Sequence, residues 1–173
     1  MDWKKIRAVT MDVDGVLTDG GLEAHDNHEM VRVFNAKDSF SMRVAAMRGL
    51  FTGVFSGGNT EGVLNRLATS GVAPEDIYLG CRGKIRAFED FCSRHGVDPS
   101  EVLYIGDDVP DVPVLKAAGI GAVPADAAKD AMDAADYICE LPGGRGCVRE
   151  VVEKILRKQG RWHFEGTDFE MIF

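Results

Sequence analysis

The sequence has no cysteine pair with the spacing of a metal-binding or redox motif. Its four cysteines are Cys81, Cys92, Cys139 and Cys147, and no Cys/His grouping has zinc-finger spacing. We therefore expect free thiols in a reducing cytoplasm. No apolar run approaches the length of a membrane span. The first apolar run turns polar again at Asp12, so we also expect no signal-peptide core.

The sequence also lacks an excess of positive charge, since its formal net charge is -8. Nucleic acids and anionic membranes are bound by basic faces, so we expect neither as a partner. The net charge does not exclude a small anionic substrate, because a local cluster of Lys, Arg and a metal ion can make the electrostatic potential inside one cleft positive. The 173 residues, 45% of them hydrophobic, fit a single domain with a real core.

Apolar runs alternate with helical patterns from one end of the chain to the other. The expected strands span residues 6–11, 50–55, 77–79, 102–105, 120–123 and 137–139. The expected helices span residues 39–48, 60–70, 84–95, 111–118, 127–135 and 148–158. This alternation predicts an α/β fold, a three-layer, Rossmann-like parallel sheet with helices on both faces.

One segment interrupts the alternation. Residues 21–34 contain two short strand-like stretches about the turn-forming tetrad at 25–28, His-Asp-Asn-His. We predict a β-hairpin inserted at about residues 20–35, within a single domain of residues 1–159. The tail, residues 160–173, is rich in aromatic residues and is expected to pack on the surface or to act as a lid.

Polar residues follow four of the expected strands, Lys84 as the first residue of the helix after the third strand. They are Asp12 and Asp14, then Ser56, then Lys84, and finally Asp107, Asp108 and Asp111. The carboxyl ends of parallel strands meet at one edge of a sheet, where such folds bind ligands. Clustered carboxylates require a cation, and oxygen ligands without Cys or His favour Mg²⁺. A lysine at a helix N-terminus and a serine near backbone amides suit phosphate oxygens, so the set predicts phosphoryl transfer.

These residues carry a family resemblance that covers about residues 8–156. Residues 12–18, DVDGVLT, match the DxDGx[LVW]T signature of haloacid dehalogenase-like hydrolases, and the other three segments match the remaining motifs in order. The chain more closely resembles the phosphatases of 3-deoxy-D-manno-octulosonate 8-phosphate and of nine-carbon sialic-acid-type 9-phosphates. The added points of resemblance are TDG at 18–20, KDS at 37–39, IGDDVPD at 105–111 and GGRG at 143–146. The gaps between the motifs leave no room for a separate cap domain.

The resemblance implies roles for the acidic residues. Asp12 would be the nucleophile that forms an aspartyl-phosphate, and Asp14 the general acid and then the general base. In an extended chain the side chain of Asp14 would return to the face of Asp12. Asp12, the Asp14 carbonyl and Asp107 would hold Mg²⁺. Asp108 and Asp111 would support these ligands or add an occasional extra one, or else cap the helix that follows.

The resemblance also implies that Ser56, Gly57 and Lys84 hold the phosphoryl oxygens. The chain departs from the pattern at Gly58, where the relatives carry a charged residue that contacts the substrate. Four arginines could hold a substrate carboxylate instead: Arg66, Arg82, Arg86 and Arg145.

The expected substrate is a small anionic phosphorylated sugar acid. A site without a cap domain lies open to water; the resemblance implies a homotetramer, built by the hairpins, in which neighbouring chains close the cleft. One alternative is a phosphatase of broad or macromolecular specificity. Another is a non-catalytic oligomerisation module of a sialic-acid-activating system, although such a module need not keep Asp12, Asp14, Lys84 and Asp107 together.

Overall fold

The computed structural model describes residues 1–26 and 30–171. Six parallel strands form the central sheet in the order β5-β4-β1-β6-β7-β8. The strands are β1 (Ala8–Met11), β4 (Phe51–Phe55), β5 (Ile77–Tyr78), β6 (Val102–Ile105), β7 (Ile120–Val123) and β8 (Tyr137–Ile138). Each expected strand is present, so the predicted parallel α/β sheet is confirmed.

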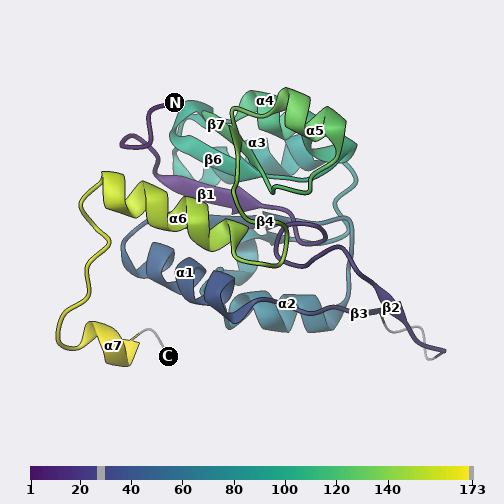
Figure 1. The fold of residues 1–173 in the computed structure, drawn as a ribbon, viewed down its shortest axis with the longest axis horizontal. Helices are drawn as coiled ribbons and strands as arrows, with labels where there is room; N and C mark the ends of the chain where they lie inside the picture. Colours follow the sequence, from purple (N-terminus) through teal and green to yellow (C-terminus); the bar gives the residue numbers. More distant parts are fainter. Residues whose placement is uncertain (27–29, 172–173) are drawn as a thin grey trace.

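Helices cover both faces of this sheet (Figure 1). Those packed on one face are α1 (Ala36–Met47), α2 (Glu61–Ala68) and α6 (Cys147–Lys158), whose side chains join one apolar cluster. Those packed on the other face are α3 (Lys84–His95), α4 (Val112–Ala117) and α5 (Lys129–Ala134), which join a second cluster. The architecture therefore has the three layers that the sequence predicts.

The two central strands supply side chains to both clusters. In β1, Val9 and Met11 belong to the cluster under α1 and α6, whereas Ala8 belongs to the cluster under α3 and α4. Successive residues of a strand point to opposite faces, so a strand covered on both sides reads as a continuous apolar run. This explains why the strands could be recognised in the sequence as short apolar runs.

Helix boundaries differ from the expected ones where capping decides them. Helix α3 begins and ends as predicted, and Gly96 ends it in the left-handed conformation. Helix α1 begins three residues earlier than expected, because the side chain of Asn35 accepts a hydrogen bond from the Lys37 N–H. Helix α4 begins one residue later, after the 3₁₀ turn η3 (Val109–Asp111).

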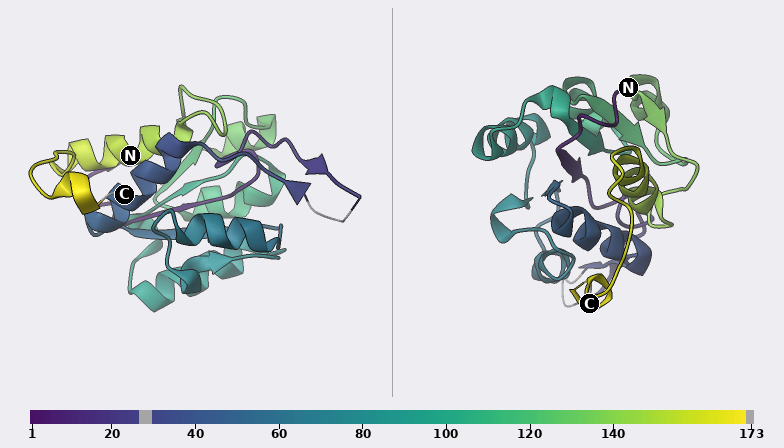
Figure 2. Two further views of the ribbon diagram at one scale, coloured as in Figure 1. Left: turned by 90° about the horizontal axis from the view of Figure 1, so that it is seen from below. Right: turned by 90° about the vertical axis from the view of Figure 1, so that its left-hand side faces the viewer.

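The predicted hairpin is present as β2 (Glu23–Ala24) paired antiparallel with β3 (Met30–Val31). It projects from the end of the molecule where the parallel strands finish (Figures 1 and 2). Residues 27 and 28 of the expected turn tetrad lie outside the described residues. Large apolar side chains are exposed on and beside the hairpin: Leu22, Met30, Val31 and Val33.

The tail packs against its own chain and ends in α7 (Asp168–Met171). Arg48, at the end of α1, forms an ion pair with Asp168, with 2.7 Å between Nη2 and Oδ2. The Arg149 guanidinium lies 5.2 Å from the ring of Phe40 and 5.3 Å from that of Trp162. Figure 1 places this tail at the end of the molecule opposite the hairpin. That the tail acts as a lid stays a prediction.

Within the described residues, no helix has the length and apolar composition needed to cross a membrane.

Candidate active site

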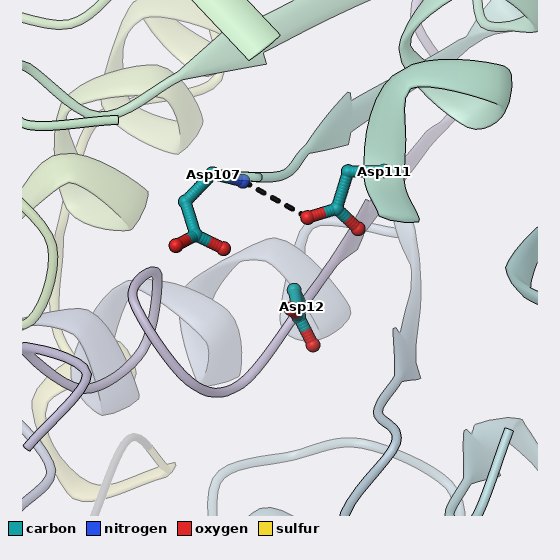
Figure 3. A group of neighbouring side chains, drawn as sticks. All are labelled: Asp12, Asp107 and Asp111. Atoms are coloured by element: carbon teal, nitrogen blue, oxygen red, sulfur yellow. Dashed lines mark hydrogen bonds between the residues drawn. The ribbon is translucent and has the colours of Figure 1, made fainter. Parts of the chain in front are cut away.

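Three aspartates from two strand ends meet in one place (Figure 3). Asp12 follows β1, Asp107 follows β6, and Asp111 lies in the turn η3. One carboxylate oxygen from each lies within 4.8 Å of the others. The strands β1 and β6 are neighbours in the sheet, with Met11 paired to Ile105. The convergence expected at the carboxyl edge of the sheet is therefore present for these residues.

The carboxylate of Asp12 is held at both oxygens. Its Oδ1 accepts a hydrogen bond of 2.7 Å from the Val13 N–H, and its Oδ2 lies 2.6 Å from Nζ of Lys84. The Asp12 N–H donates to the Ile105 carbonyl, which continues the β1–β6 ladder by one residue. The nucleophile proposed from the sequence thus has a fixed orientation before any substrate binds.

Lys84 connects the two buried carboxylates. It is the first residue of α3, and its Nζ also lies 2.6 Å from Oδ1 of Asp111. Its side chain is only 7% exposed. Burial alone would lower the pKa of Lys84, but the negative charges of Asp12 and Asp111 outweigh this and raise it. Lys84 is therefore a permanent cation inside the site.

Asp111 organises the loop that carries Asp107. It is fully buried and accepts hydrogen bonds from the Tyr104 hydroxyl and from the backbone N–H groups of Asp107 and Asp108. The side chain of Asp108 is exposed and caps η3 by accepting from the Val109 N–H. Of the two residues expected to support the metal ligands, Asp111 therefore lies in the cluster, and Asp108 caps a turn.

Burial and repulsion from neighbouring carboxylates raise the pKa values of Asp12 and Asp107. Burial raises the pKa of Asp12 to about 6, against the opposing charge of Lys84. Burial, with the charges of Asp12 and Asp111, raises the pKa of Asp107 to about 7. One lysine thus leaves negative charge uncompensated at neutral pH. A divalent cation among these oxygen ligands would supply the missing charge, so the residues present fit such an ion.

We expect the free energy of unfolding of the protein in chelator to fall as the pH rises from about 4 to about 7. The folded-state pKa values of Asp12 and Asp107 lie above the ordinary 3.8, so the folded state binds more protons in this window. Buried Asp38, whose pKa burial raises to about 6, acts in the same direction. Urea unfolding at several pH values would measure this. Mg²⁺ should remove much of the decline, whereas greater stability at the alkaline end in chelator would contradict the prediction.

Asp14 lies in a tight turn and does not contribute to the three-aspartate cluster. The Val13 carbonyl accepts hydrogen bonds from the N–H groups of Val16, Leu17 and Thr18, so the chain folds back directly after β1. The extended chain invoked in the sequence analysis is therefore wrong. The carboxylate of Asp14 instead forms an ion pair with Arg32, with 2.7 Å between Arg32 Nε and Oδ1.

The same turn requires glycine at position 15. Gly15 has a φ of 84°, which favours glycine, and a Cβ placed on it would lie 2.0 Å from Oδ2 of Asp107. The turn after β1 and the loop after β6 therefore touch directly through this residue. The GGRG segment at residues 143–146 stabilises this turn, since the Gly144 N–H donates a hydrogen bond to the Val16 carbonyl.

Ser56 and Gly57 follow β4, the other neighbour of β1. The Oγ of buried Ser56 accepts a hydrogen bond from the Gly58 N–H. A Cβ placed on Gly57 would meet nothing within 4 Å, so the space beside this backbone is open. That Ser56, Gly57 and Lys84 hold a phosphate stays a prediction.

Comparison with known proteins identifies the family. A model described as haloacid dehalogenase-like hydrolase matches residues 75–146. The 3-deoxy-D-manno-octulosonate 8-phosphate phosphatase of Salmonella typhi is 35% identical over 158 residues, which cover 91% of this chain and 83% of the relative. The chain belongs to the haloacid dehalogenase-like hydrolases. It is a phosphatase of that family, and the resemblance seen in its sequence is confirmed.

Solved structures agree with this assignment. The Moraxella catarrhalis 3-deoxy-D-manno-octulosonate 8-phosphate phosphatase, solved with a magnesium ion, a phosphate ion and a KDO molecule, has a TM-score of 0.88 and 29% identity. The match covers 92% of the present chain and 91% of the Moraxella catarrhalis chain. The cobalt-bound deoxy-D-mannose-octulosonate 8-phosphate phosphatase of Haemophilus influenzae also has a TM-score of 0.88, with 33% identity and coverage of 92% and 89%.

The arginines proposed as substrate contacts lie in different environments in this phosphatase. Arg66 lines a cavity of about 770 Å³ between the hairpin and α2, and donates a 2.7 Å hydrogen bond to Oγ of Ser39. Arg82 and Arg86, before and within α3, are exposed. Arg145 forms an exposed ion pair with Asp19. The cavity places Arg66 beside the hairpin; contact of any of the four with substrate stays a prediction.

Sequence reasoning missed two residues of the phosphatase site. Arg32, which holds Asp14, belongs to the segment after β3, and no motif in the sequence marks it. Tyr104, which donates to Asp111, stands within the apolar run of β6 and resembles an ordinary core residue. The sequence did carry one signal for Tyr104. A hydroxyl in a strand that is buried on both faces requires a hydrogen-bond partner, so Tyr104 could have been expected to contact a polar group.

Proposed function

We propose that this phosphatase hydrolyses the phosphate monoester of a 2-keto-3-deoxy sugar acid, of the 3-deoxy-D-manno-octulosonate 8-phosphate or nine-carbon 9-phosphate class. The observation that carries the proposal is the convergence of Asp12, Asp107, Asp111 and Lys84 in a chain that resembles phosphatases of this substrate along nine-tenths of its length. Hydrolysis proceeds through an aspartyl-phosphate on Asp12 in the presence of Mg²⁺.

In the first step, a carboxylate oxygen of Asp12 attacks phosphorus and the bond from phosphorus to the sugar oxygen breaks. Asp14 gives its proton to the departing alkoxide. In the second step, Asp14 takes a proton from water, which attacks phosphorus and breaks the bond to Asp12, releasing inorganic phosphate. Ser56, the Gly57 backbone and Lys84 hold the phosphoryl oxygens throughout.

Mg²⁺ would be held by the carboxylates of Asp12 and Asp107 and by the carbonyl of Asp14. When bound, it neutralises the negative charge that the phosphoryl group brings to the site. Asp111 keeps the Asp107 loop in place through its hydrogen bonds to two backbone N–H groups. The raised pKa values of Asp12 and Asp107 support this assignment: they are caused by burial and by the neighbouring carboxylates, and a divalent cation would stabilise these buried negative charges.

A panel of phosphate esters tests the substrate class. With Mg²⁺, we expect kcat/KM for 3-deoxy-D-manno-octulosonate 8-phosphate or a nine-carbon 9-phosphate to exceed that for glucose 6-phosphate by roughly 100-fold. EDTA should remove the activity and Mg²⁺ should restore it. Similar kcat/KM values across the panel would instead support the alternative of broad specificity. Unchanged hydrolysis in chelator would exclude a role for the metal.

We also propose that the phosphatase acts as a homotetramer built by the hairpins. The exposed apolar side chains of Leu22, Met30, Val31 and Val33 are concentrated on one projecting element, a pattern typical of a protein interface. Sedimentation velocity would distinguish a tetramer from a monomer. A monomer with full and selective activity would contradict a cleft completed by neighbouring chains.

A further inference from the structure

The Arg32 side chain connects three segments of the site. Its Nε and Nη2 donate to the two carboxylate oxygens of Asp14 at 2.7 and 3.0 Å. Its Nη1 donates to the Met30 carbonyl at 3.2 Å and to Oγ1 of Thr60 at 3.4 Å. The turn after β1, the hairpin and the loop after β4 are thus joined through one guanidinium.

This guanidinium is better buried than the carboxylate it holds. The Arg32 side chain is 5% exposed, whereas that of Asp14 is 31% exposed. A two-point contact between Arg and a carboxylate restricts the plane of the carboxylate as well as its distance. Burial fixes the guanidinium, so Asp14 takes its orientation from Arg32.

The local sequence makes room for the guanidinium. A Cβ placed on Gly58 would lie 3.1 Å from Nη2 of Arg32, closer than ordinary van der Waals contact. A side chain at position 58 would therefore require the Arg32 guanidinium to shift by a few tenths of an ångström. Gly58, Arg32 and Asp14 form one arrangement contributed by three separate segments.

Asp14 has few other restraints. It lies in a turn rather than in a strand, and among the residues that the structure describes Arg32 is the hydrogen-bond partner of its carboxylate. Proton transfer requires the acid within hydrogen-bond reach of the leaving oxygen, and small misplacements reduce the rate strongly. A group that fixes the Asp14 carboxylate therefore acts on the step that Asp14 performs.

We propose that Arg32 is a positioning residue that holds the Asp14 carboxylate in the orientation needed for proton transfer to the leaving group. This inference rests on the proposed function of Asp14 as general acid. Arg32 acts through Asp14, and its contribution is therefore greatest for substrates whose leaving group needs a proton. In the first step, weakly basic leaving groups depart without a proton, so phosphoryl transfer from them to Asp12 should depend little on either residue.

A series of aryl phosphates from p-nitrophenyl phosphate to phenyl phosphate tests this, because it grades the basicity of the leaving group and does not depend on the natural substrate. The readout is kcat/KM, which reports the first step and not the hydrolysis of the aspartyl-phosphate. For Arg32→Gln we expect kcat/KM on p-nitrophenyl phosphate to stay within about threefold of the parent, and kcat/KM on phenyl phosphate to fall roughly tenfold or more. Asp14→Asn should show the same steeper dependence, and the double variant should lose no more than Asp14→Asn alone.

Arg32→Lys separates positioning from charge, because lysine keeps the positive charge but cannot form the two-point contact. We expect Arg32→Lys to fold and to show the same steeper dependence of the rate on leaving-group basicity as Arg32→Gln. Arg157→Gln is the matched control, since Arg157 pairs with Glu153 on the exposed side of α6. Urea unfolding of each variant checks that the fold persists.

The outcomes separate this inference from the function on which it rests. If Asp14→Asn leaves the dependence on leaving group unchanged, the assignment of Asp14 as general acid fails. If Asp14→Asn changes it and Arg32→Gln does not, Asp14 keeps its role and the role of Arg32 is overturned. Restoration of the parent dependence by Arg32→Lys, or a loss of kcat/KM of equal size for every aryl phosphate, would likewise overturn the positioning role.

Discussion

Phosphate release by Asp12→Asn is expected to fall by at least about 10⁴-fold, the order of loss that follows removal of a covalent nucleophile. The amide that replaces the carboxylate is too weak a nucleophile to attack phosphorus. It can still accept the hydrogen bond from the Val13 N–H that Asp12 accepts now. The change therefore removes the chemistry while it keeps the local turn.

The assay is release of inorganic phosphate from p-nitrophenyl phosphate with Mg²⁺ present. Asp133→Asn is the matched control, because Asp133 makes only an exposed ion pair with Lys129 on α5. The control should retain the parent rate. Turnover by Asp12→Asn at a rate close to that of the parent would exclude Asp12 as the nucleophile.

Lys84→Met is expected to reduce both activity and stability. The variant leaves the carboxylates of Asp12 and Asp111 buried without the cation that lies 2.6 Å from each. Removing one partner of a buried ion pair lowers the free energy of unfolding by about 3–5 kcal/mol. Loss of a positive charge that stabilises the transferred phosphoryl group should lower kcat by about 10²–10³-fold.

The effect on stability should be larger at about pH 8 than at about pH 5, because protonation of Asp12, whose pKa burial raises to about 6, relieves its repulsion with Asp111. Urea unfolding in chelator measures the stability, and steady-state kinetics with Mg²⁺ measure the activity. Lys129→Met, on the exposed surface of α5, is the matched control and should change neither. Full activity in Lys84→Met would show that Lys84 has no part in holding the phosphoryl group.

The strand ends of this phosphatase could be predicted because local patterns mark them. The apolar run before Asp12 is stopped by a carboxylate, and the run before Asp107 is stopped by glycine and a carboxylate. A parallel sheet then requires these ends to meet at one edge. The beginning of α1 was misplaced, since the cap formed by Asn35 depends on backbone geometry that apolar periodicity does not reveal.

The orientation of the individual side chains could not be predicted in the same way. The turn after Val13 redirects Asp14 toward the hairpin, and an argument from an extended chain cannot anticipate such a turn. The burial of Tyr104 against Asp111 depends on the packing of α3 and α4 over β6. The position of the tail on α1 depends on a contact between residues far apart in the chain, Arg48 and Asp168.

The sequence by itself determined the parallel α/β fold, the phosphatase family and the set of residues at the strand ends, because each is encoded in short local patterns. Only the tertiary structure decided which carboxylates share a centre, that Lys84 joins two of them, and that Arg32 holds Asp14. The physical reason is that orientation and pairing depend on the strand order and on turns. The strand order and the turns bring together side chains that are far apart in the sequence, and the residues next to each side chain do not indicate which partner it will contact.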